Sequence, residues 1–455
     1  MRNPFTDTDR RCIEAIRRTA HVFADLERPD LDPVVEHIGA APLVLLGEAT
    51  HGSEEFYRLR AELSLRLIVE RGFDAVAVEA DWPDALRASR YAQGAGADAD
   101  AGAALGGFMR FPRWMWRNTA VRDWIERLRA HNLALPPGAP RVGFYGLDLY
   151  SLQASTQAVI AFLERSDPQA AAEARRRYQC FDGYAAEPQH YGAATHFGLA
   201  PDCQQAVLQQ LQALFGRMVQ RLGAGDAPAR DELFYAQQNA RVVKNAEAYY
   251  RTMFDGRTDS WNLRDTHMAE TLELLRAHLS QRLGRPAKIV VWAHNSHVGD
   301  ARATESADRG QLNLGQLVRE RDTRDDGDRP YLLGFTTYSG SVAAASDWNE
   351  PVERKAVLRA REDSVEQLLH GSGLGAFFLP LDGEALRTLE RPRLERAIGV
   401  IYRPDTERLS HYFRASLAEQ FDGVVHIDET RAVTPLDAST SWQDASEPQL
   451  TPTGM

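Results

Sequence analysis

Four short apolar segments of the chain end in carboxylates or histidines. A polar residue that ends a single strand is usually a turn former. Four such segments that all carry acids or histidines, and no lysine, instead favour one shared functional site. The residues are Glu48 in 43–48, Glu79 in 74–80, Asp148 in 141–148 and His294 in 288–295, with His51 and His297 three positions after Glu48 and His294.

A histidine beside a carboxylate is suited to the activation of water. Histidine titrates near neutral pH, so it can take a proton from water as the water attacks an ester. A neighbouring carboxylate sets the tautomer of the imidazole and stabilises its charged form, and a second imidazole can donate to the developing oxyanion. Glu48 and His51 are close enough in sequence to share a pocket, and His294 and His297 can supply the donors.

The motifs of several other enzyme classes are missing from the sequence. It contains no G-x-S-x-G nucleophile turn, no HExxH, no P-loop and no strand followed by G-x-G-x-x-G. We therefore expect a hydrolase without a serine nucleophile, a metal or another cofactor. Two alternatives stay open: His294 and His297 could bind zinc or a similar divalent ion in a hydrolase or transferase, and the protein could bind a small molecule without turning it over.

The elements that must position these residues alternate between strands and helices. The apolar segments are nearly continuous in hydrophobicity, which is typical of strands buried on both faces of a parallel sheet. Ser53 and Gly72 are the expected first and last caps of a helix between two of them. The predicted strands are 43–48, 74–80, 141–148, 288–295, 331–338, 376–381, 397–402 and 423–427. The pattern predicts an α/β fold with a mostly parallel central sheet flanked by helices, whose carboxyl edge binds the ligand.

The middle of the chain has a different pattern. Strand signals nearly vanish after residue 150, and long helical patterns cover 154–164, 204–221, 231–253 and 263–282. We interpret 151–284 as a helical insertion in an α/β catalytic core made of 1–150 and 285–435. The last residues, 436–455, are rich in Ser, Thr, Pro and Asp, and we expect a flexible tail there.

Composition and charge exclude some partners. The net charge of −11 and the pI of about 5.7 argue against nucleic acid as a partner. No apolar run reaches the roughly 20 residues that a membrane helix needs, and the N-terminus lacks the apolar region of a signal peptide. Cys12, Cys180 and Cys203 form no CxxC pair and do not indicate a disulfide framework. We expect a cytoplasmic protein that acts on a small molecule, and the sequence indicates no oligomeric state.

Seven stretches of the chain resemble the erythromycin esterase family. The most specific are the GEATHG motif, which opens 47–60, and the AHNSH motif within 292–300. The others are 77–82 (AVEADW), 111–118 (FPRWMWRN), 146–150 (GLDLY), 261–265 (WNLRD) and 395–404 (ERAIGVIYRP). The resemblance runs from about residue 40 to about residue 430.

The resemblance implies an ester or lactone hydrolase with an α/β core and a helical subdomain. It implies that His51 is the base that activates water, with Glu48, Glu79, His294, His297 and Arg60 as the other active-site residues. From spacing alone, Arg60 would be an exposed helix arginine. The resemblance also suggests macrolides as substrates and a role in antibiotic resistance, but fold and motif define a site and leave its substrate a separate question.

Four further residues are candidates for contacts with substrate. Asp148 ends a central strand, and Trp82, Trp114 and Trp116 lie near or after strand ends, where aromatic side chains could form a pocket wall. On a predicted helix, Arg264 and His267 are interpreted as surface or interdomain residues.

Overall fold

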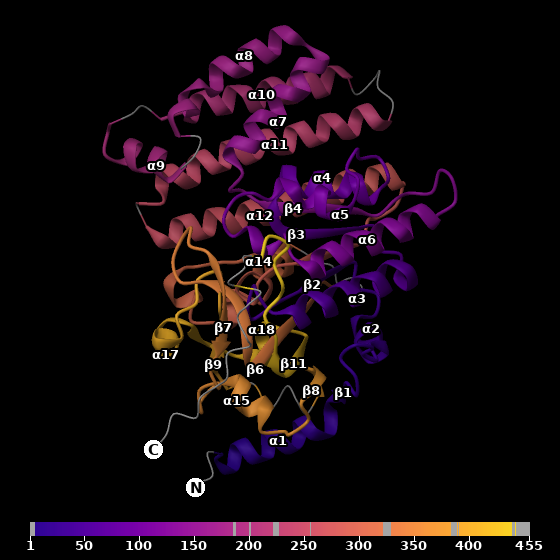
Figure 1. The fold of residues 1–455 in the computed structure, drawn as a ribbon, viewed down its shortest axis with the longest axis vertical. Helices are drawn as coiled ribbons and strands as arrows, with labels where there is room; N and C mark the ends of the chain where they lie inside the picture. Colours follow the sequence, from indigo (N-terminus) through magenta and orange to yellow (C-terminus); the bar gives the residue numbers. More distant parts are fainter. Residues whose placement is uncertain are drawn as a thin grey trace. The chain divides into compact units, whose positions relative to one another are not determined.

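The protein has an α/β fold with a mostly parallel central sheet, as the sequence predicts (Figure 1). The computed structural model describes residues 5–184, 188–199, 202–221, 227–254, 256–321, 329–383, 389, 391–438 and 442. The chain divides into two compact units, the first made of 1–76, 90–143 and 288–455 and the second of 77–89 and 144–287.

The first unit contains most of the sheet. Its strands lie in the order β1-β8-β11-β6-β2-β5, and β7 pairs with β6. The four strands β11, β6, β2 and β5 are parallel, whereas β1, β8 and β7 are antiparallel to their neighbours. The bounds are β1 His21–Val22, β2 Leu43–Leu46, β5 Ile289–Trp292, β6 Tyr331–Ala345, β7 Val352–Val357, β8 Ala376–Pro380 and β11 Gly423–Thr430.

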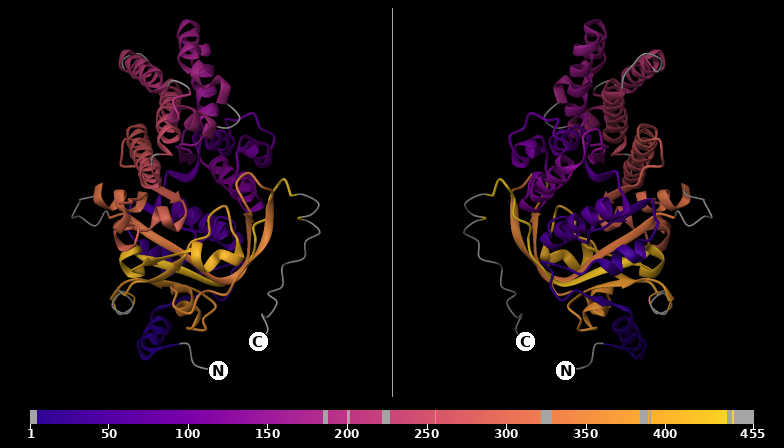
Figure 2. Two further views of the ribbon diagram at one scale, coloured as in Figure 1. Left: turned by 90° about the vertical axis from the view of Figure 1, so that its left-hand side faces the viewer. Right: turned by 90° about the vertical axis from the view of Figure 1, so that its right-hand side faces the viewer.

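Two features of this sheet differ from the predicted strands. The segment 397–402 is not a strand, because only Ile398 and Ile401 form isolated bridges. β6 runs on past the predicted end at residue 338 and curves into a hairpin with β7 (Figure 2). β9 (Arg393–Arg396) and β10 (Tyr412–Ala415) form a separate antiparallel pair.

The predicted helix after Ser53 is α3, Glu54–Arg71. Gly72 ends it in the left-handed conformation, with φ of 68°. The other helices of the first unit are α1 Asp7–Thr19, α2 Asp32–Ile38, α5 Ala101–Ala104, α6 Thr119–Ala134, α13 Asn295–Val298, α14 Leu314–Arg321, α15 Val365–His370, α17 Glu407–Ser410 and α18 Leu417–Gln420.

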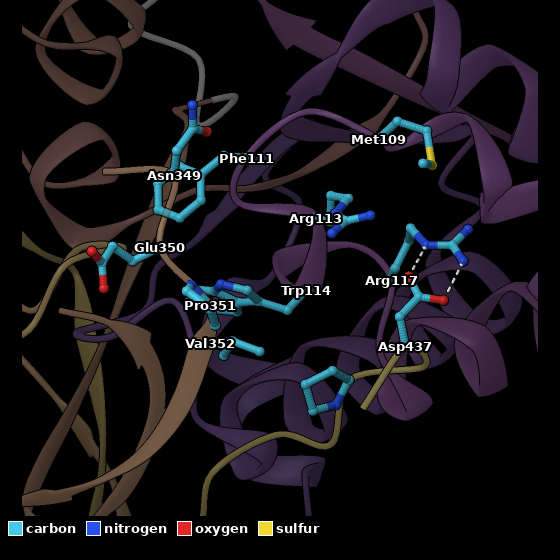
Figure 3. A pocket seen from close by; sticks show the side chains of 11 residues that line it. Met109, Phe111, Arg113, Trp114, Arg117, Asn349, Glu350, Pro351, Val352 and Asp437 are labelled. Atoms are coloured by element: carbon cyan, nitrogen blue, oxygen red, sulfur yellow. Dashed lines mark hydrogen bonds and ion pairs between the residues drawn. The ribbon is translucent and has the colours of Figure 1, made fainter. Parts of the chain in front are cut away.

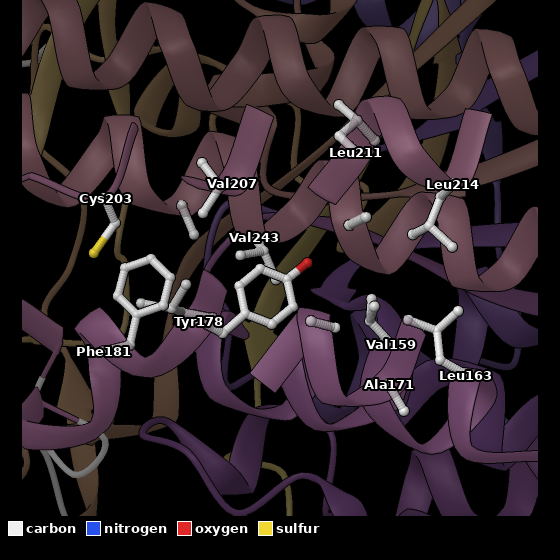
Figure 4. Packing of buried hydrophobic residues seen from close by; sticks show 14 of the residues in the cluster. Val159, Leu163, Ala171, Tyr178, Phe181, Cys203, Val207, Leu211, Leu214 and Val243 are labelled. Atoms are coloured by element: carbon white, nitrogen blue, oxygen red, sulfur yellow. The ribbon is translucent and has the colours of Figure 1, made fainter. Parts of the chain in front are cut away.

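The second unit is mainly helical. It contains α7 Leu152–Ser166, α8 Pro168–Tyr178, α9 Pro188–His196, α10 Gln204–Arg221, α11 Ala227–Thr252 and α12 Arg257–Leu283. Apolar side chains of α7, α8, α10 and α11 form its core, among them Val159, Leu214 and Val243 (Figure 4). The ends of the neighbouring strands β3 (Ala75–Asp81) and β4 (Gly143–Asp148) also belong to it, as does most of α4 (Trp82–Ala92).

Cys180 and Cys203 form a disulfide bond in this unit. The expectation that the cysteines build no disulfide is therefore wrong for this pair. The two residues are 23 positions apart in the sequence, and their Cα atoms lie 6.1 Å apart because the two segments that carry them pack on the same core. Sequence spacing alone does not show such a contact.

The predicted domain boundaries stay a prediction. The second unit, as the contacts define it, includes 77–89, 144–150 and 285–287 in addition to the predicted insertion. Of the predicted tail, 439–441 and 443–455 lie outside the described residues. No helix in the described ranges is long and apolar enough to cross a membrane.

Candidate active site

Glu48 and His294 follow two neighbouring parallel strands at the same level. β2 pairs with β5 so that Leu46 lies opposite Trp292, and each candidate residue comes two positions later. The pairing continues beyond the strands, because the backbone N–H of Asn295 donates to the carbonyl oxygen of Glu48 at 2.8 Å. The register therefore brings both residues to the carboxyl edge of the sheet, where ligands bind in folds of this type.

His51 contacts both of these residues. Its Nδ1 lies 2.9 Å from Oε1 of Glu48, and its ring centroid lies 4.9 Å from that of His294. A carboxylate can only accept a hydrogen bond, so Nδ1 of His51 carries the proton. In the neutral imidazole Nε2 is then left with a free lone pair, as a general base requires.

Arg60 is buried and paired with Glu48. One of its guanidinium nitrogens donates to Oε2 of Glu48 at 2.5 Å, and only 1% of the arginine side chain is exposed. Its guanidinium also lies 4.8 Å from the ring centroid of Tyr57 and 5.2 Å from that of Trp292. The expectation of a solvent-exposed arginine is therefore wrong. α3 begins directly after the loop that carries His51, so Arg60 on its second turn can reach back to the carboxylate.

His294 has the opposite tautomer to His51. The backbone N–H of Ser296 donates to Nδ1 of His294 at 3.2 Å, so this nitrogen is an acceptor and the proton of the neutral ring is on Nε2. His51 thus offers an acceptor and His294 a donor. His294 is the N-cap of the short helix α13. His297 lies on this helix and is buried.

Backbone contacts hold the loop between β2 and α3. The N–H of Ile398 donates to the carbonyl oxygen of Ala49 at 2.8 Å, and the N–H of Val433 donates to that of Gly52 at 2.8 Å. A Cβ at Gly52 would lie 2.0 Å from the carbonyl oxygen of Ala343, so no other residue fits this approach. The irregular segment around Ile398 replaces the predicted strand because its hydrogen bonds go to this loop.

Asn295 connects the two motifs through its side chain. Its amide donates to the carbonyl oxygen of Phe335 at 2.8 Å and accepts from the N–H of the same residue at 3.2 Å. A Cβ on Gly47 would lie only 2.1 Å from Oδ1 of Asn295. The glycine before Glu48 therefore makes room for the asparagine after His294, and this packing fixes the two motifs against each other.

The other two predicted carboxylates lie in the second unit, where Arg264 binds both. One guanidinium nitrogen lies 2.6 Å from Oε1 of Glu79 and 2.7 Å from Oδ2 of Asp148, and Nε lies 3.0 Å from Oδ1 of Asp148. Burial alone would lower the pKa of Arg264, but the electrostatic effects of Asp148, Tyr150 and Glu79 outweigh it and raise this pKa. The triad is a fixed ion pair network with a permanent cation.

The three candidate tryptophans have different surroundings. Trp82 is buried in the second unit, with its ring 5.9 Å from that of Tyr145 and almost parallel to it. Trp116 is buried in the first unit and packs near Phe108. Trp114 lines a pocket of about 420 Å³ in the first unit (Figure 3).

The structure thus groups Glu48, His51, Arg60 and His294 in the first unit, and Glu79 with Asp148 in the second. The meeting of all these residues at one site stays a prediction. Sequence reasoning missed Arg264 and Asn295 as parts of these clusters. Buried carboxylates such as Glu79 and Asp148 need a cation nearby. Arg264 in the WNLRD stretch was the residue of the sequence that could have been recognised as this cation.

Comparison with known proteins identifies the family. The family model described as erythromycin esterase matches residues 68–430. The chain belongs to the erythromycin esterase family. The matched range begins after Arg60, so the GEATHG motif lies before it. An erythromycin esterase type II from Escherichia coli is 23% identical over 438 residues, which cover 90% of this chain and 96% of the relative.

Solved structures share the fold of this family member. A succinoglycan biosynthesis protein superposes with a TM-score of 0.73 at 22% identity and covers 94% of this chain and 99% of its own. A Bacillus cereus protein has a TM-score of 0.75 at 20% identity, with 95% and 100% covered. The erythromycin esterase EreC, as a histidine-to-asparagine mutant in its open conformation, has a TM-score of 0.63 at 17% identity, with 92% and 99% covered. At these identities the likeness concerns the fold.

Proposed function

We propose that this erythromycin esterase family member hydrolyses an ester or lactone, with His51 as general base and without a serine nucleophile. The observation that carries the proposal is the position of His51. Its Nδ1 is bonded to Glu48, and its ring lies 4.9 Å from that of His294. Family membership supports a hydrolase that acts on a small molecule.

The proposed reaction begins with proton transfer from water to Nε2 of His51 as the water oxygen attacks the carbonyl carbon. Glu48 stabilises the imidazolium that forms, and Arg60 holds the Glu48 carboxylate in position. Nε2–H of His294 donates to the oxyanion of the tetrahedral intermediate. When the intermediate collapses, His51 returns the proton to the leaving alkoxide, which gives an alcohol and an acid.

We also propose active-site roles for His297 and Glu79. In the second unit, Arg264 would hold Glu79 and Asp148 in fixed orientations. The proposed substrate contacts are Asp148, Trp82, Trp114 and Trp116. Macrolides are one candidate substrate class, since the Escherichia coli relative is named an erythromycin esterase. A cytoplasmic location and a role in antibiotic resistance stay predictions.

We propose that the reaction needs no divalent metal. Both oxygens of Glu48 are already bonded, one to His51 and one to the cation of Arg60. In the described part of the chain, no group of three or more His, Cys, Asp or Glu side chains is arranged to hold a metal ion. Metal analysis, with activity before and after chelation, tests this. A loss of activity that an added divalent ion restores would favour the metal-dependent alternative.

A panel of aryl esters and macrolactones tests the function, with His51→Ala as the decisive variant. We expect turnover to fall by several orders of magnitude with the fold intact, because the base is lost. His190→Ala, an exposed histidine of α9, is the matched control. Near wild-type rates in His51→Ala would contradict the mechanism, and a wild type that hydrolyses none of the panel would favour a binding protein.

Ser296→Ala tests the absence of a serine nucleophile. The Oγ of Ser296 lies 2.9 Å from Nδ1 of His294, so it is the serine that a covalent mechanism would use. We expect this variant to keep most of the activity, because the backbone N–H of residue 296 still orients His294. A variant as inactive as His51→Ala, or an acyl adduct on Ser296 in a mass spectrum, would overturn the proposal.

A further inference from the structure

A pocket in the first unit lies beside the loop that carries His51. It has a volume of about 420 Å³, within the range of small-molecule sites (Figure 3). Its walls come from the loop that includes Phe111 and Trp114, the tip of the β6–β7 hairpin, and the segment that includes Pro435. The walls therefore combine three regions that are far apart in the sequence.

Two contacts connect this pocket to His51. The hydroxyl of Tyr57 lies 2.7 Å from the carbonyl oxygen of His51 and 2.9 Å from that of Met115, the neighbour of Trp114. On the other side, Val433 binds the backbone of Gly52, and Pro435 follows two positions later. The segments that form the pocket walls are thus bonded to the backbone of the proposed base and of the residue after it.

Part of the apolar wall is exposed to solvent, whereas Trp114 is only 5% exposed. Met109 is 60% exposed, and its neighbour in the wall, Phe111, lies with its ring 4.9 Å from that of Trp348, which is itself 47% exposed. Large apolar side chains gathered at a surface pocket mark ligand sites, because their exposure to water is unfavourable until a ligand covers them. Flat aromatic rings on the wall suit a flat aromatic ligand.

The charge in the pocket favours an anion. Arg113 is exposed and extends into the pocket, and within the described ranges it forms no ion pair (Figure 3). The second arginine, Arg117, is paired with Asp437 through two contacts of 2.7 Å, which lower the pKa of Asp437 and keep this carboxylate charged. The carboxylate of Glu350 points away from Arg113 (Figure 3). Arg113 also helps to lower the pKa of Asp437, but its guanidinium forms no ion pair in the described part of the chain and can therefore bind a ligand.

We propose that this pocket binds the aromatic, carboxylate-bearing part of the substrate, with the ring against Phe111 and the carboxylate on Arg113. The proposal rests on the proposed function and names its substrate class: small aromatic esters that carry a carboxylate in addition to the ester. A guanidinium binds a carboxylate through two parallel hydrogen bonds, which makes the contact specific as well as strong.

Binding is tested first, independently of turnover. Calorimetric titration with 4-hydroxybenzoate and with its neutral amide is carried out on wild type, His51→Ala, Arg113→Met and Arg122→Met. Arg122 is a control because it is an arginine of α6 whose side chain is 43% exposed and pairs with Asp123. We expect 4-hydroxybenzoate to bind wild type, His51→Ala and Arg122→Met alike, and to bind Arg113→Met about tenfold more weakly. Equal binding to wild type and Arg113→Met, or no binding to wild type, would overturn the proposal.

Hydrolysis is tested with 4-acetoxybenzoate and 4-acetoxybenzamide. We expect wild type to have the higher kcat/KM for the anionic ester, and Arg113→Met to lose this preference while it still hydrolyses the amide-bearing ester. A preference that survives in Arg113→Met would contradict the site. If wild type hydrolyses neither of these esters nor any member of the panel above, but still binds 4-hydroxybenzoate through Arg113, the proposed function fails and the binding site stands.

Discussion

Arg60→Met should be among the most destabilising single changes in the first unit. The side chains of Arg60 and Glu48 are 1% and 2% exposed, and they are joined at 2.5 Å. Methionine fills similar volume but leaves the Glu48 carboxylate buried without its cation. The removal of one partner from a buried ion pair typically costs about 3–5 kcal/mol. We also expect kcat to fall more than tenfold, because the carboxylate that orients His51 loses its second anchor.

A control on the same helix separates this effect from a general loss of charge. Arg66 of α3 forms ion pairs with Asp32 and Glu70, but its side chain is 25% exposed. Arg66→Met should therefore cost at most about 1 kcal/mol. Urea unfolding of both variants, with ester hydrolysis as a second readout, measures the difference.

A double variant tests the origin of the cost. Glu48→Gln combined with Arg60→Met removes the buried charge, so it should be more stable than Arg60→Met alone and yet remain inactive. If Arg60→Met unfolds at the same urea concentration as Arg66→Met, the ion pair does not stabilise the fold as argued.

Two further predictions concern other parts of the chain. Gly47→Ala should lower both stability and kcat, because the added Cβ would lie 2.1 Å from Oδ1 of Asn295; Gly399→Ala, where no atom lies within 4 Å, is the control in thermal unfolding and activity assays. His267 makes stability depend on pH. Burial and the charge of Arg241 lower the pKa of His267 to about 3, so the folded protein binds fewer protons than the unfolded chain between pH 6.5 and 3, and stability falls as the pH falls through this range. The difference between this pKa and the ordinary value of 6.5 corresponds to a change of roughly 5 kcal/mol at most in the free energy of unfolding. Urea unfolding of His267→Gln should show a weaker dependence between pH 6.5 and 4, and an unchanged dependence would contradict the assignment.

The sequence was sufficient to locate two strands of the central sheet and the polar residues that follow them. The apolar segment before Glu48 and the one before His294 could be recognised because strands buried on both faces are almost continuously hydrophobic. Their parallel pairing then follows from the α/β pattern and brings the two chain segments to one edge. Ser53 and Gly72 also marked the ends of α3 correctly. Gly72 ends the helix in the left-handed conformation, a local preference, whereas the Ser53 side chain makes no capping hydrogen bond.

The pairing of the side chains at that edge depends on tertiary packing. Three contacts join residues from separate segments. Arg60 is buried against Glu48, Asn295 packs against Gly47, and Ile398 is hydrogen-bonded to the loop of His51. Arg264 reaches two strand-end carboxylates from a helix more than a hundred positions after the second of them. Hydrophobic periodicity reports which face of an element is buried, but it carries no information about which distant charge neutralises a buried one. The pairing of a buried charge depends on packing. At Glu48 it leaves one carboxylate oxygen for Nδ1 of His51, so that Nε2 of His51 is the nitrogen that can act as a base.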